Sequence, residues 1–416
     1  MKVLKITGNQ ELTGSIRISG AKNSAVALIP AVLLANAKTT LCNVPNISDI
    51  DILEKTLNYL NVDIKRASGS MIIDTTNLKN LEIPEELSSR LRASYYFMAV
   101  LLARFKQVKM HFPGGCQIGS RPIDQTLKAF KALGATVTEE NDAFLIEADE
   151  LIGSEFVLDM PSVGATINAI LVATLAKGET IIKNAAREPE ITDLINMLNK
   201  MGAKIEGIGT SEIKVTGVEE LKGCNHDIIS DRIEAGTYTI IGALLGNNLK
   251  IDNIIPEHIK SLTDNLQKMG STLTIYEDYL IINKTSLTSI DAKTLHYPGF
   301  PTDLQQPFVS LLTQAEGISH MEENIYENRF MNIPYLNEMG ANISVDGKVA
   351  TIKGKTKLKG KTVKATDLRA GASLLVAALI AEGETTITDI NHILRGYEEI
   401  VEKLTNAGAK IKIEEI

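Results

Sequence analysis

Six runs of the chain are rich in Ala, Leu, Val and Ile and carry few charged residues inside them. They cover residues 25–37, 95–104, 166–177, 237–247, 308–316 and 372–382. A helix that is apolar on every side has no face for water, so these runs predict six buried helices. Short β-type runs such as residues 179–183, 280–283 and 385–388 predict strands between them. The pattern indicates a mixed α/β protein with helices inside.

A second kind of helix alternates apolar and charged residues at helical spacing, as residues 127–133 and 400–407 do. Such a helix has one polar face, so it is expected to cover the outside of a domain. Gly-Ala or a near equivalent follows this helix, and the feature recurs along the chain at intervals of 68 to 73 residues. A fixed period indicates repeated structural units. The sequence therefore predicts six units of roughly βαβαββ form, each with one helix inside and one outside.

A third recurrence links the start of the chain to later segments. Residues 6–14, 215–223 and 352–360 share one spacing of apolar, Gly and Leu positions. The N-terminal segment is thus the end of a repeat displaced to the front, and it is expected to complete the domain that holds the last units. We predict one three-unit domain over residues 22–230 and another over residues 1–21 and 231–416. An active site is expected in the interdomain cleft.

Composition narrows the functional classes. The 416 residues are 44% hydrophobic and 23% charged, and the net charge of −8 argues against a general nucleic-acid binder. The three cysteines, Cys42, Cys116 and Cys224, are too few and too widely spaced for a disulfide framework. Cys224 has one histidine nearby, which is a weak metal signal, so we predict no metal. The chain start lacks a signal-peptide core and no apolar stretch reaches about 18 residues, which predicts a cytoplasmic protein.

A short polar stretch precedes each buried helix, and we single out one cation in each of three of these stretches: Lys22, Arg92 and Arg369. Free backbone N–H groups and the helix dipole favour anions at a helix N-terminus, so a cation there is unfavourable unless an anion lies between them. We interpret these positions as anion-binding. Ser, Thr and Asp in the same stretches also fit ordinary N-caps. Arg329 and Arg395 lie in connections where other units carry Pro, and a solvated ion pair is the alternative for both.

The segment that best fits a functional site is residues 112–125. Pro113 and three glycines exclude a helix or strand interior and predict a loop. The loop carries Cys116 and, five residues later, Arg121, the kind of side chain that grips a carboxylate or phosphate with two hydrogen bonds. A surface turn with an incidental small hydrophobe is the alternative.

Motifs of commoner chemistries are missing from the sequence. There is no G-x-x-x-x-G-K-[ST] phosphate loop, no complete dinucleotide fingerprint, no H-E-x-x-H and no G-x-S-x-G. What remains is a basic, metal-free site with one thiol and a few carboxylates.

A set of motifs in one order carries a family resemblance. They are residues 19–23, 92–94, 113–116, 121–125, 162–166, 184–190, 300–303, 327–330, 367–369 and 395–397. Together they closely resemble the UDP-N-acetylglucosamine 1-carboxyvinyltransferase family, from about residue 4 to the end of the chain. The resemblance implies an α/β fold of two inside-out α/β barrel domains, each of three βαβαββ repeats around buried helices. This agrees with the repeat pattern.

The resemblance implies a reaction: the enolpyruvyl group of phosphoenolpyruvate moves to the 3-hydroxyl of UDP-N-acetylglucosamine, and phosphate is released. This is the first committed step of peptidoglycan synthesis. Cys116 corresponds to the loop cysteine that acts as general acid on the methylene group, can form a covalent phosphoenolpyruvate adduct and is alkylated by the antibiotic fosfomycin. Asp303 would accept the proton of the sugar hydroxyl. The catalytic set so implied is Cys116, Asp303, Lys22 and Arg395, with no cofactor.

The resemblance also implies two sets of binding residues. Phosphoenolpyruvate would be held by Lys22, Asn23, Arg121 and Arg395. The nucleotide sugar would be lined by Arg92, Arg121, Pro122, Ile123, Asp124, Gln125, Ser162, Val163, Gly164, Asp303 and Ile325. Supporting residues would be Asp367, Arg369 and Arg329. Met160 stands where part of the family has a lysine near the nucleotide phosphates, which leaves that one contact open.

Two alternatives remain, one of related chemistry and one of a different class of function. EPSP synthase uses the same fold and the same donor but has no Pro-Gly-Gly-Cys loop, so Cys116 with Arg121 favours the nucleotide-sugar acceptor. A catalytically silent relative kept for binding or regulation is disfavoured because all matched site residues are present. We expect a monomer in solution whose partners are phosphoenolpyruvate and UDP-N-acetylglucosamine, with no nucleic acid and no membrane.

Overall fold

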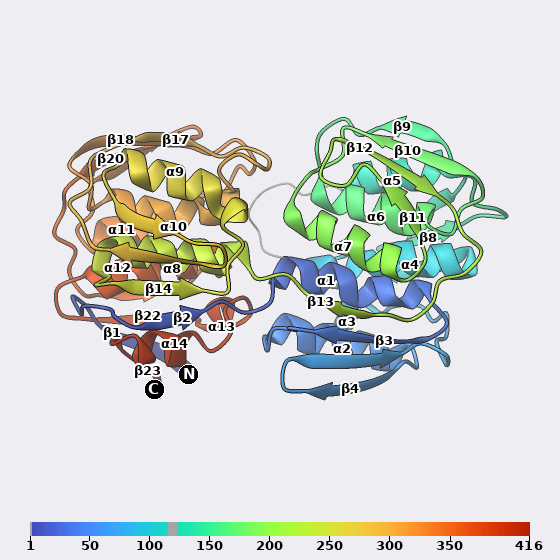
Figure 1. The fold of residues 1–416 in the computed structure, drawn as a ribbon, viewed down its shortest axis with the longest axis horizontal. Helices are drawn as coiled ribbons and strands as arrows, with labels where there is room; N and C mark the ends of the chain where they lie inside the picture. Colours follow the sequence, from blue (N-terminus) through green and yellow to red (C-terminus); the bar gives the residue numbers. More distant parts are fainter. Residues whose placement is uncertain (1, 115–122) are drawn as a thin grey trace. The chain divides into compact units, whose positions relative to one another are not determined.

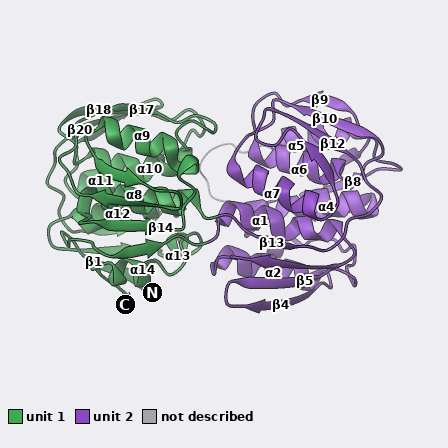
Figure 2. Cartoon of the chain, viewed as in Figure 1, with its two compact units in different colours: residues 1–19, 117–120, 230–416 green, residues 20–116, 121–229 purple. Residues whose placement is uncertain are grey.

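The computed structural model describes residues 2–114 and 123–416 (Figure 1). These residues form two compact units (Figure 2). Unit 1 holds residues 2–19 and 230–416, and unit 2 holds residues 20–114 and 123–229. Within the described residues the chain therefore passes from one unit to the other after residue 19 and again after residue 229. Each unit has its own apolar core.

The described strands of unit 1 form three four-stranded sheets. The first has the order β21 (Thr362–Lys364), β22 (Glu384–Thr388), β1 (Lys2–Thr7), β23 (Lys410–Glu415). The second has the order β15 (Thr272–Ile275), β16 (Tyr279–Asn283), β14 (Leu249–Asp252), β2 (Ser15–Arg17). The third has the order β17 (Asp291–Lys293), β18 (Gly317–Glu322), β20 (Val349–Gly354), β19 (Ile343–Asp346). Each sheet joins one parallel pair to antiparallel neighbours.

The start of the chain completes two of these sheets. β1 pairs antiparallel with both β22 and β23, which places Leu4 opposite Ile387 and Ile413. β2 pairs in parallel with β14, far along the chain. The first strands thus belong to the unit formed by the second half of the sequence.

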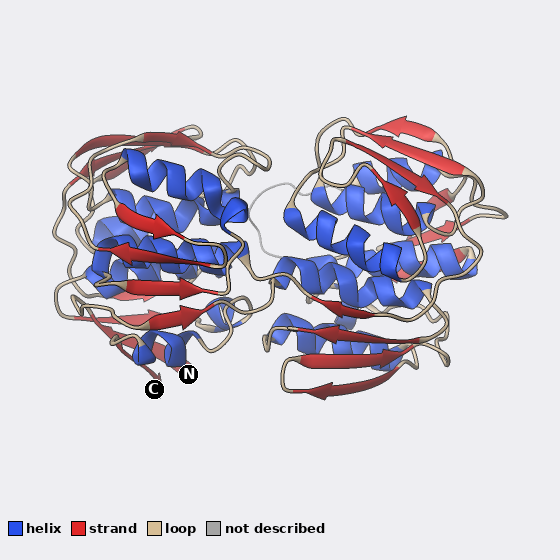
Figure 3. Cartoon of the chain, in the orientation of Figure 1, coloured by secondary structure: helices blue, strands red, loops and turns tan. Residues whose placement is uncertain are grey.

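Three helices fill the inside of unit 1: α8 (Arg232–Leu245), α10 (Thr302–Leu312) and α12 (Leu368–Ile380). Each packs against the other two, and Figure 3 shows these helices with strands around them. Every residue of α8 after Arg232 is buried, as an apolar sequence on all sides requires. Shorter elements complete the unit: η3 (Pro256–Ile259), α9 (Lys260–Lys268), α11 (Ile333–Glu338), α13 (Asn391–Leu394) and α14 (Ile400–Asn406).

Unit 2 repeats this plan with two four-stranded sheets and one three-stranded sheet among its described strands. They are β11 (Lys204–Glu206), β12 (Glu212–Thr216), β10 (Glu179–Lys183), β9 (Glu155–Val157); β13 (Asn225–Asp227), β3 (Lys38–Cys42), β5 (Ser70–Asp74), β4 (Asp63–Ala67); and β6 (Gln107–His111), β8 (Ala143–Glu147), β7 (Thr136–Glu140).

The inner helices of unit 2 are α1 (Lys22–Ala31), α4 (Tyr96–Phe105) and α6 (Val163–Ala173), and α4 packs against both of the others. The remaining helices are η1 (Val32–Leu34), α2 (Ser48–Tyr59), α3 (Glu85–Ser88), η2 (Arg92–Tyr95), α5 (Asp124–Ala132) and α7 (Pro189–Lys200). Within the described residues, no helix combines the length and the apolarity that a membrane crossing needs.

The six buried helices predicted from the sequence are present, but most of them begin earlier than the apolar pattern indicates. The pattern starts two of them at residues 308 and 372, whereas α10 begins at Thr302 and α12 at Leu368. The reason is that the first turns are polar or charged. The short polar stretches expected to precede the buried helices therefore contain their first turns.

Candidate functional site

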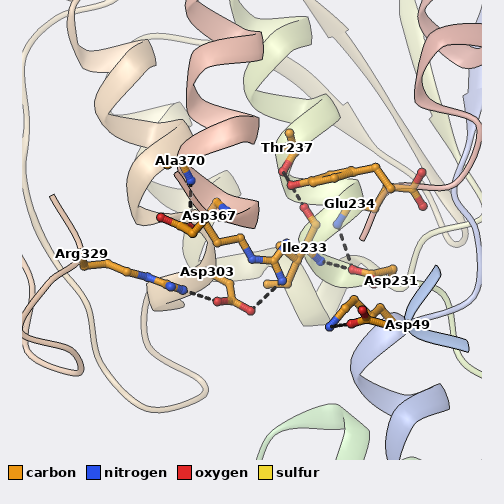
Figure 4. Close-up of polar contacts among 12 residues, drawn as sticks. Asp49, Asp231, Ile233, Glu234, Thr237, Asp303, Arg329, Asp367 and Ala370 are labelled. Carbon is orange, nitrogen blue, oxygen red and sulfur yellow. Dashed lines mark hydrogen bonds and ion pairs between the residues drawn. The ribbon is translucent and has the colours of Figure 1, made fainter. Parts of the chain in front are cut away.

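Asp303 lies in the first turn of α10 and is held between two arginines (Figure 4). Arg369 Nη2, from the first turn of α12, donates to Asp303 Oδ2 at 2.8 Å. Arg329, in the segment after β18, donates to Asp303 Oδ1. The side chains of Arg329 and Arg369 are 3% and 7% exposed, against 25% for Asp303. The carboxylate is thus the accessible part of this cluster.

Positive charge sets the protonation state of Asp303. Burial alone favours the neutral acid, but the charges of Arg369, Arg329 and Arg232 outweigh burial and hold the pKa of Asp303 far below its usual range. Burial also lowers the pKa of Arg369, and the charge of Asp303 more than reverses this. Asp303 is therefore ionised at neutral pH. A carboxylate with so low a pKa is a poor proton acceptor while both arginine contacts last.

Tyr397 supports Arg369 from a buried position. Its hydroxyl lies 2.9 Å from Thr237 Oγ1 of α8 and also hydrogen-bonds the Arg369 side chain. Burial raises the pKa of Tyr397, so the phenol stays neutral. Arg395 lies in the same unit, half-buried in the turn that follows α13 and two residues before Tyr397. The same short segment therefore carries Arg395, a predicted site residue, and Tyr397, which supports Arg369.

Carboxylates cap two of the inner helices of unit 1. Asp367 Oδ1 accepts hydrogen bonds from the backbone N–H groups of Arg369 at 2.8 Å and Ala370 at 3.1 Å. Asp231 Oδ1 does the same for Ile233 and Glu234 in α8, at 2.8 and 2.9 Å. These caps satisfy N–H groups that a helix start leaves without partners. They also fix the first turns that carry Arg369 and Arg232.

Two of the three cations predicted at helix starts, Lys22 and Arg369, have carboxylate partners within the chain. Lys22 Nζ, at the start of α1, lies 3.0 Å from Asp49 Oδ2 in the first turn of α2, and Asp49 is 1% exposed. Arg369 has Asp303 in the same way. A carboxylate from another helix thus balances the cation as a bound anion would. The position of a cation at a helix start is not enough by itself to indicate a ligand. Asn23 follows Lys22 in α1 and is half-buried.

Arg92 and the 162–164 segment meet at Tyr95. The guanidinium carbon of Arg92 lies 5.7 Å from the centre of the Tyr95 ring. The Tyr95 hydroxyl lies directly against Gly164, where an added Cβ would come within 1.5 Å of the oxygen. Ser162 caps α6, its hydroxyl accepting from Ala165 N at 3.3 Å, and Val163 begins the helix. Residues widely separated in the sequence, all predicted to bind the nucleotide sugar, therefore lie close together.

The start of α5 carries three further predicted residues, Ile123, Asp124 and Gln125. Gln125 is buried and ties α5 to residue 159: its amide donates to Asp159 Oδ2 at 2.9 Å and its carbonyl accepts from Asp159 N at 2.8 Å. Hydrogen bonds from Lys128 and Gln125 lower the pKa of Asp159. Asp124 is exposed, and so is Met160, with 60% of its surface accessible. Gln125 thus has a structural task, and its amide also donates to Asp124 Oδ2 at 2.9 Å.

Ile325 lies half-buried in the turn after β18. Its backbone N–H donates to Glu323 Oε1 at 2.8 Å. The same turn leads to Arg329, so two predicted residues share one short segment.

Cys116, Arg121 and Pro122 lie outside the described residues. The segment before them is held by Arg92, whose Nη1 donates to the carbonyl oxygen of Pro113 at 3.5 Å. Cys42 and Cys224 are free, half-buried thiols, and burial raises the pKa of Cys224. In the part of the chain that the structure describes, no group of three or more His, Cys, Asp or Glu is arranged to hold a metal ion.

Sequence reasoning did not assign a role to Asp49, Tyr95, Glu323 or Tyr397. In the sequence, Asp49 looks like an ordinary acidic residue in the first turn of a helix. No nearby residue indicates that Lys22 lies beside it. Tyr397 stands in one of the quoted motifs, but its contact with Arg369 depends on the packing of α12. Only the three-dimensional arrangement gives these residues a place at the site.

Comparison with known proteins gives the relatives of this chain. A family model described as EPSP synthase (3-phosphoshikimate 1-carboxyvinyltransferase) matches residues 6–404. UDP-N-acetylglucosamine 1-carboxyvinyltransferase 2 of Geobacillus kaustophilus is 50% identical over 412 residues, which cover 99% of this chain and 96% of that protein. The protein of the same name from Bacillus subtilis is 50% identical over 413 residues, with the same coverage. UDP-N-acetylglucosamine 1-carboxyvinyltransferase of Clostridium botulinum is 49% identical over 414 residues, 99% of both chains.

Solved structures share the fold. The enolpyruvyl transferase NikO from Streptomyces tendae matches with a TM-score of 0.90 at 26% identity, over 99% of this chain and 98% of that one. EPSP synthase from Acinetobacter baumannii matches over the whole of both chains with a TM-score of 0.77 at 19% identity, a likeness that concerns the fold alone. The mixed α/β fold with several small sheets is thus common to these structures.

Proposed function

The chain belongs to the UDP-N-acetylglucosamine 1-carboxyvinyltransferases of the EPSP synthase family, and from this premise we propose that it transfers the carboxyvinyl group of phosphoenolpyruvate to the 3-hydroxyl of UDP-N-acetylglucosamine. Phosphate is released, and the product enters peptidoglycan synthesis. The observation that carries the proposal is the identity of about half of all residues with relatives of that name over nearly the whole length of the chain.

The chemistry asks for an acid and a base. Protonation of the methylene carbon gives a cation-like centre, which the sugar hydroxyl attacks, and loss of a methyl proton with phosphate restores the double bond. In our proposal Cys116 supplies the first proton and can also form a covalent adduct with phosphoenolpyruvate. Asp303 takes the proton of the sugar hydroxyl. Its contacts with Arg369 and Arg329 support this role only if one of them weakens as the hydroxyl approaches, because the pKa of Asp303 is otherwise too low.

The donor carries a phosphate and a carboxylate, so its site needs cations. We assign this task to Lys22, Arg121 and Arg395, with Asn23 as a neutral donor. Lys22 is 14% exposed and its partner Asp49 lies deeper, which supports a lysine held by one carboxylate and still open to a second anion.

The acceptor is a larger molecule and takes more residues. We assign to it Arg92, Asp303, Ile325, the 121–125 segment and the 162–164 segment. The contact of Tyr95 with both Arg92 and Gly164 supports a common surface in unit 2. Asp367, Arg329 and Arg369 act on Asp303 or on the helix starts rather than on the substrates.

One assay tests the function directly. Phosphate release by the purified chain should require both phosphoenolpyruvate and UDP-N-acetylglucosamine, and the organic product should carry the carboxyvinyl group on the 3-oxygen. Shikimate 3-phosphate is the control acceptor, since the matching family model bears the name of the enzyme that uses it. Release with shikimate 3-phosphate and none with the nucleotide sugar would move the assignment to EPSP synthase, and release with neither would favour a catalytically silent protein.

Three finer statements belong to the same proposal. Each unit is an inside-out α/β barrel of three βαβαββ repeats, which the three inner helices and the surrounding sheets support. The chain works as a monomer, so light scattering should give the mass of one chain. It works in the cytoplasm, where its phosphoenolpyruvate donor is made.

A further inference from the structure

Glu323 is a buried carboxylate that no part of the proposed reaction uses. It follows β18 directly and is 3% exposed. Its Oε1 accepts hydrogen bonds from Ile325 N at 2.8 Å, Tyr326 N at 3.1 Å and Thr294 Oγ1 at 3.0 Å, and its Oε2 accepts from Thr302 Oγ1 at 3.0 Å. Four neutral donors thus converge on one acid.

These bonds join two elements that carry proposed site residues. Ile325 and Tyr326 form the turn after β18, while Thr302 is the first residue of α10 and stands next to Asp303. Further along the same loop, Arg329 donates to Asp303. The 323–329 loop is therefore attached to two consecutive residues of α10. Glu323 bonds Thr302, and Arg329 bonds Asp303.

The attachment depends on Glu323 because its carboxylate is buried and is the common acceptor of all four hydrogen bonds. Among the described residues no cation pairs with Glu323, so its charge is balanced by hydrogen bonds alone. A hydrogen bond to a charged group is stronger than one between neutral groups, and removal of one partner leaves the other buried and unsatisfied. The position of Ile325 relative to Asp303 consequently depends on this carboxylate.

We propose that Glu323 is a positioning residue for the acceptor: it fixes the turn that bears Ile325 on the first turn of α10, so that the residue contacting the nucleotide sugar and the base that receives its proton keep one spacing. This inference rests on the proposed function. It predicts that loss of the link weakens binding of UDP-N-acetylglucosamine and leaves binding of phosphoenolpyruvate unchanged.

Thr302→Val tests the link with the smallest change, since it removes the hydroxyl that bonds Glu323 Oε2 and keeps the branched shape. The KM for UDP-N-acetylglucosamine should rise about tenfold, while the KM for phosphoenolpyruvate stays within about twofold. Calorimetric titration with UDP-N-acetylglucosamine alone should show the same loss of affinity. Thr302→Ser keeps a hydroxyl and should restore most of it. Glu323→Ala should weaken acceptor binding further, and Glu322→Ala, one residue earlier on the strand, should not.

Each outcome decides between the alternatives. Equal KM values and affinities in Thr302→Val, Glu322→Ala and the wild type would overturn the inference. A lower melting temperature with an unchanged ratio of the two KM values would mean that Glu323 serves stability alone, and it would overturn the inference too. If the wild type neither binds nor converts UDP-N-acetylglucosamine, the proposed function itself fails and this role with it.

Discussion

At the scale of single residues, the two arginines on Asp303 differ in how firmly they are held. Arg369 stands on a helix. Its backbone N–H donates to the capping carboxylate of Asp367, and its side chain bonds Tyr397. Arg329 stands on a loop, and its buried Nε has no hydrogen-bond partner in the part of the chain that the structure describes. Its guanidinium lies 5.3 Å from the centre of the Tyr326 ring. We therefore expect Arg329 to be the contact that a sugar hydroxyl displaces more easily, and its release would raise the pKa of Asp303.

The replacement Asp303→Asn should affect both catalysis and stability. Phosphate release should fall by at least about a hundredfold because the base is gone. The free energy of unfolding should fall by roughly 3 kcal/mol, because two buried arginines lose their counter-charge. The pKa of Asp303 is lower in the folded chain than in the unfolded one, so this stability difference is present at neutral pH and shrinks as the pH falls below about 4.

Phosphate assays and denaturant titrations at several pH values measure these effects. Asp389→Asn is the matched control, since Asp389 pairs with Lys364 at 3.2 Å on an exposed surface where an ion pair contributes little. Turnover within tenfold of wild type would remove Asp303 from the mechanism.

The thiol of Cys116 should be the one that fosfomycin alkylates. Cys42 and Cys224 are half-buried, and burial raises the pKa of Cys224, which leaves little thiolate to open the epoxide ring. Peptide mapping by mass spectrometry after treatment should find the added mass on the Cys116 peptide, and Cys116→Ala should take up none. Labelling of Cys42 or Cys224 at the same rate would show that the Cys116 loop has no special reactivity.

At the scale of elements, the first turns of the inner helices matter most. Apolar periodicity predicts the interior of α8, α10 and α12, because burial on all sides requires it. It misses the first turns, where Arg232, Asp303 and Arg369 stand in helical conformation. A charged first turn breaks the apolar pattern, so the pattern places these residues in a loop before the helix.

The charge partners of these first turns were beyond sequence reasoning for a different reason. Lys22 with Asp49 and Asp303 with Arg329 join separate elements, and no local pattern encodes which elements pack together. The motifs supply the identities of many site residues, whereas their pairing comes only from the fold. The roles assigned to the motif residues stay predictions, and Cys116, Arg121 and Pro122 lie outside the described residues.

The cap of α12 can be tested with two substitutions at one position. Asp367 uses only Oδ1 for the cap, and its buried Oδ2 has no hydrogen-bond partner among the described residues. Asp367→Asn keeps a carbonyl oxygen for the two N–H groups and should leave stability nearly unchanged, whereas Asp367→Ala should lower the free energy of unfolding by about 1 kcal/mol. Urea titration followed by circular dichroism measures both. Equal losses in the two variants would show that the charge of Asp367, and not its cap, is what stabilises α12.

At the scale of the whole molecule, the two passages of chain between the units are anchored in unit 1 by one buried cluster. Ser19 ends the first segment of unit 1, and its N–H donates to Glu234 Oε2 at 2.8 Å. Lys403 Nζ, from α14, donates to Ser19 Oγ and to Glu234 Oε1, both at 2.6 Å. Asp231 N, just after the second passage, donates to Ser19 O at 2.9 Å. This cluster thus fixes the point at which the first passage leaves unit 1 and the point at which the second passage enters it.

This cluster should make stability depend on pH in a direction opposite to that of Asp303. Burial raises the pKa of Glu234 from 4.5 to about 7, even though Lys403 opposes the change. Between these two values the folded chain holds a proton that the unfolded chain has lost, so the contribution of Glu234 to stability is largest below pH 4.5 and falls as the pH rises through 7. Glu234→Gln removes the titration, and the difference in unfolding free energy between wild type and variant should drift by up to about 1.4 kcal/mol per pH unit in this range.

Denaturant titrations of both proteins from pH 5 to pH 8 measure that drift. Glu190→Gln offers a matched control, because Glu190 is also a buried glutamate in the first turn of a helix, but on α7 in unit 2. If the difference in unfolding free energy between wild type and Glu234→Gln does not change across this pH range, Lys403 keeps Glu234 ionised throughout. The cluster would then be a permanent ion pair at the base of both passages, and the pH dependence of the whole molecule would have to come from elsewhere.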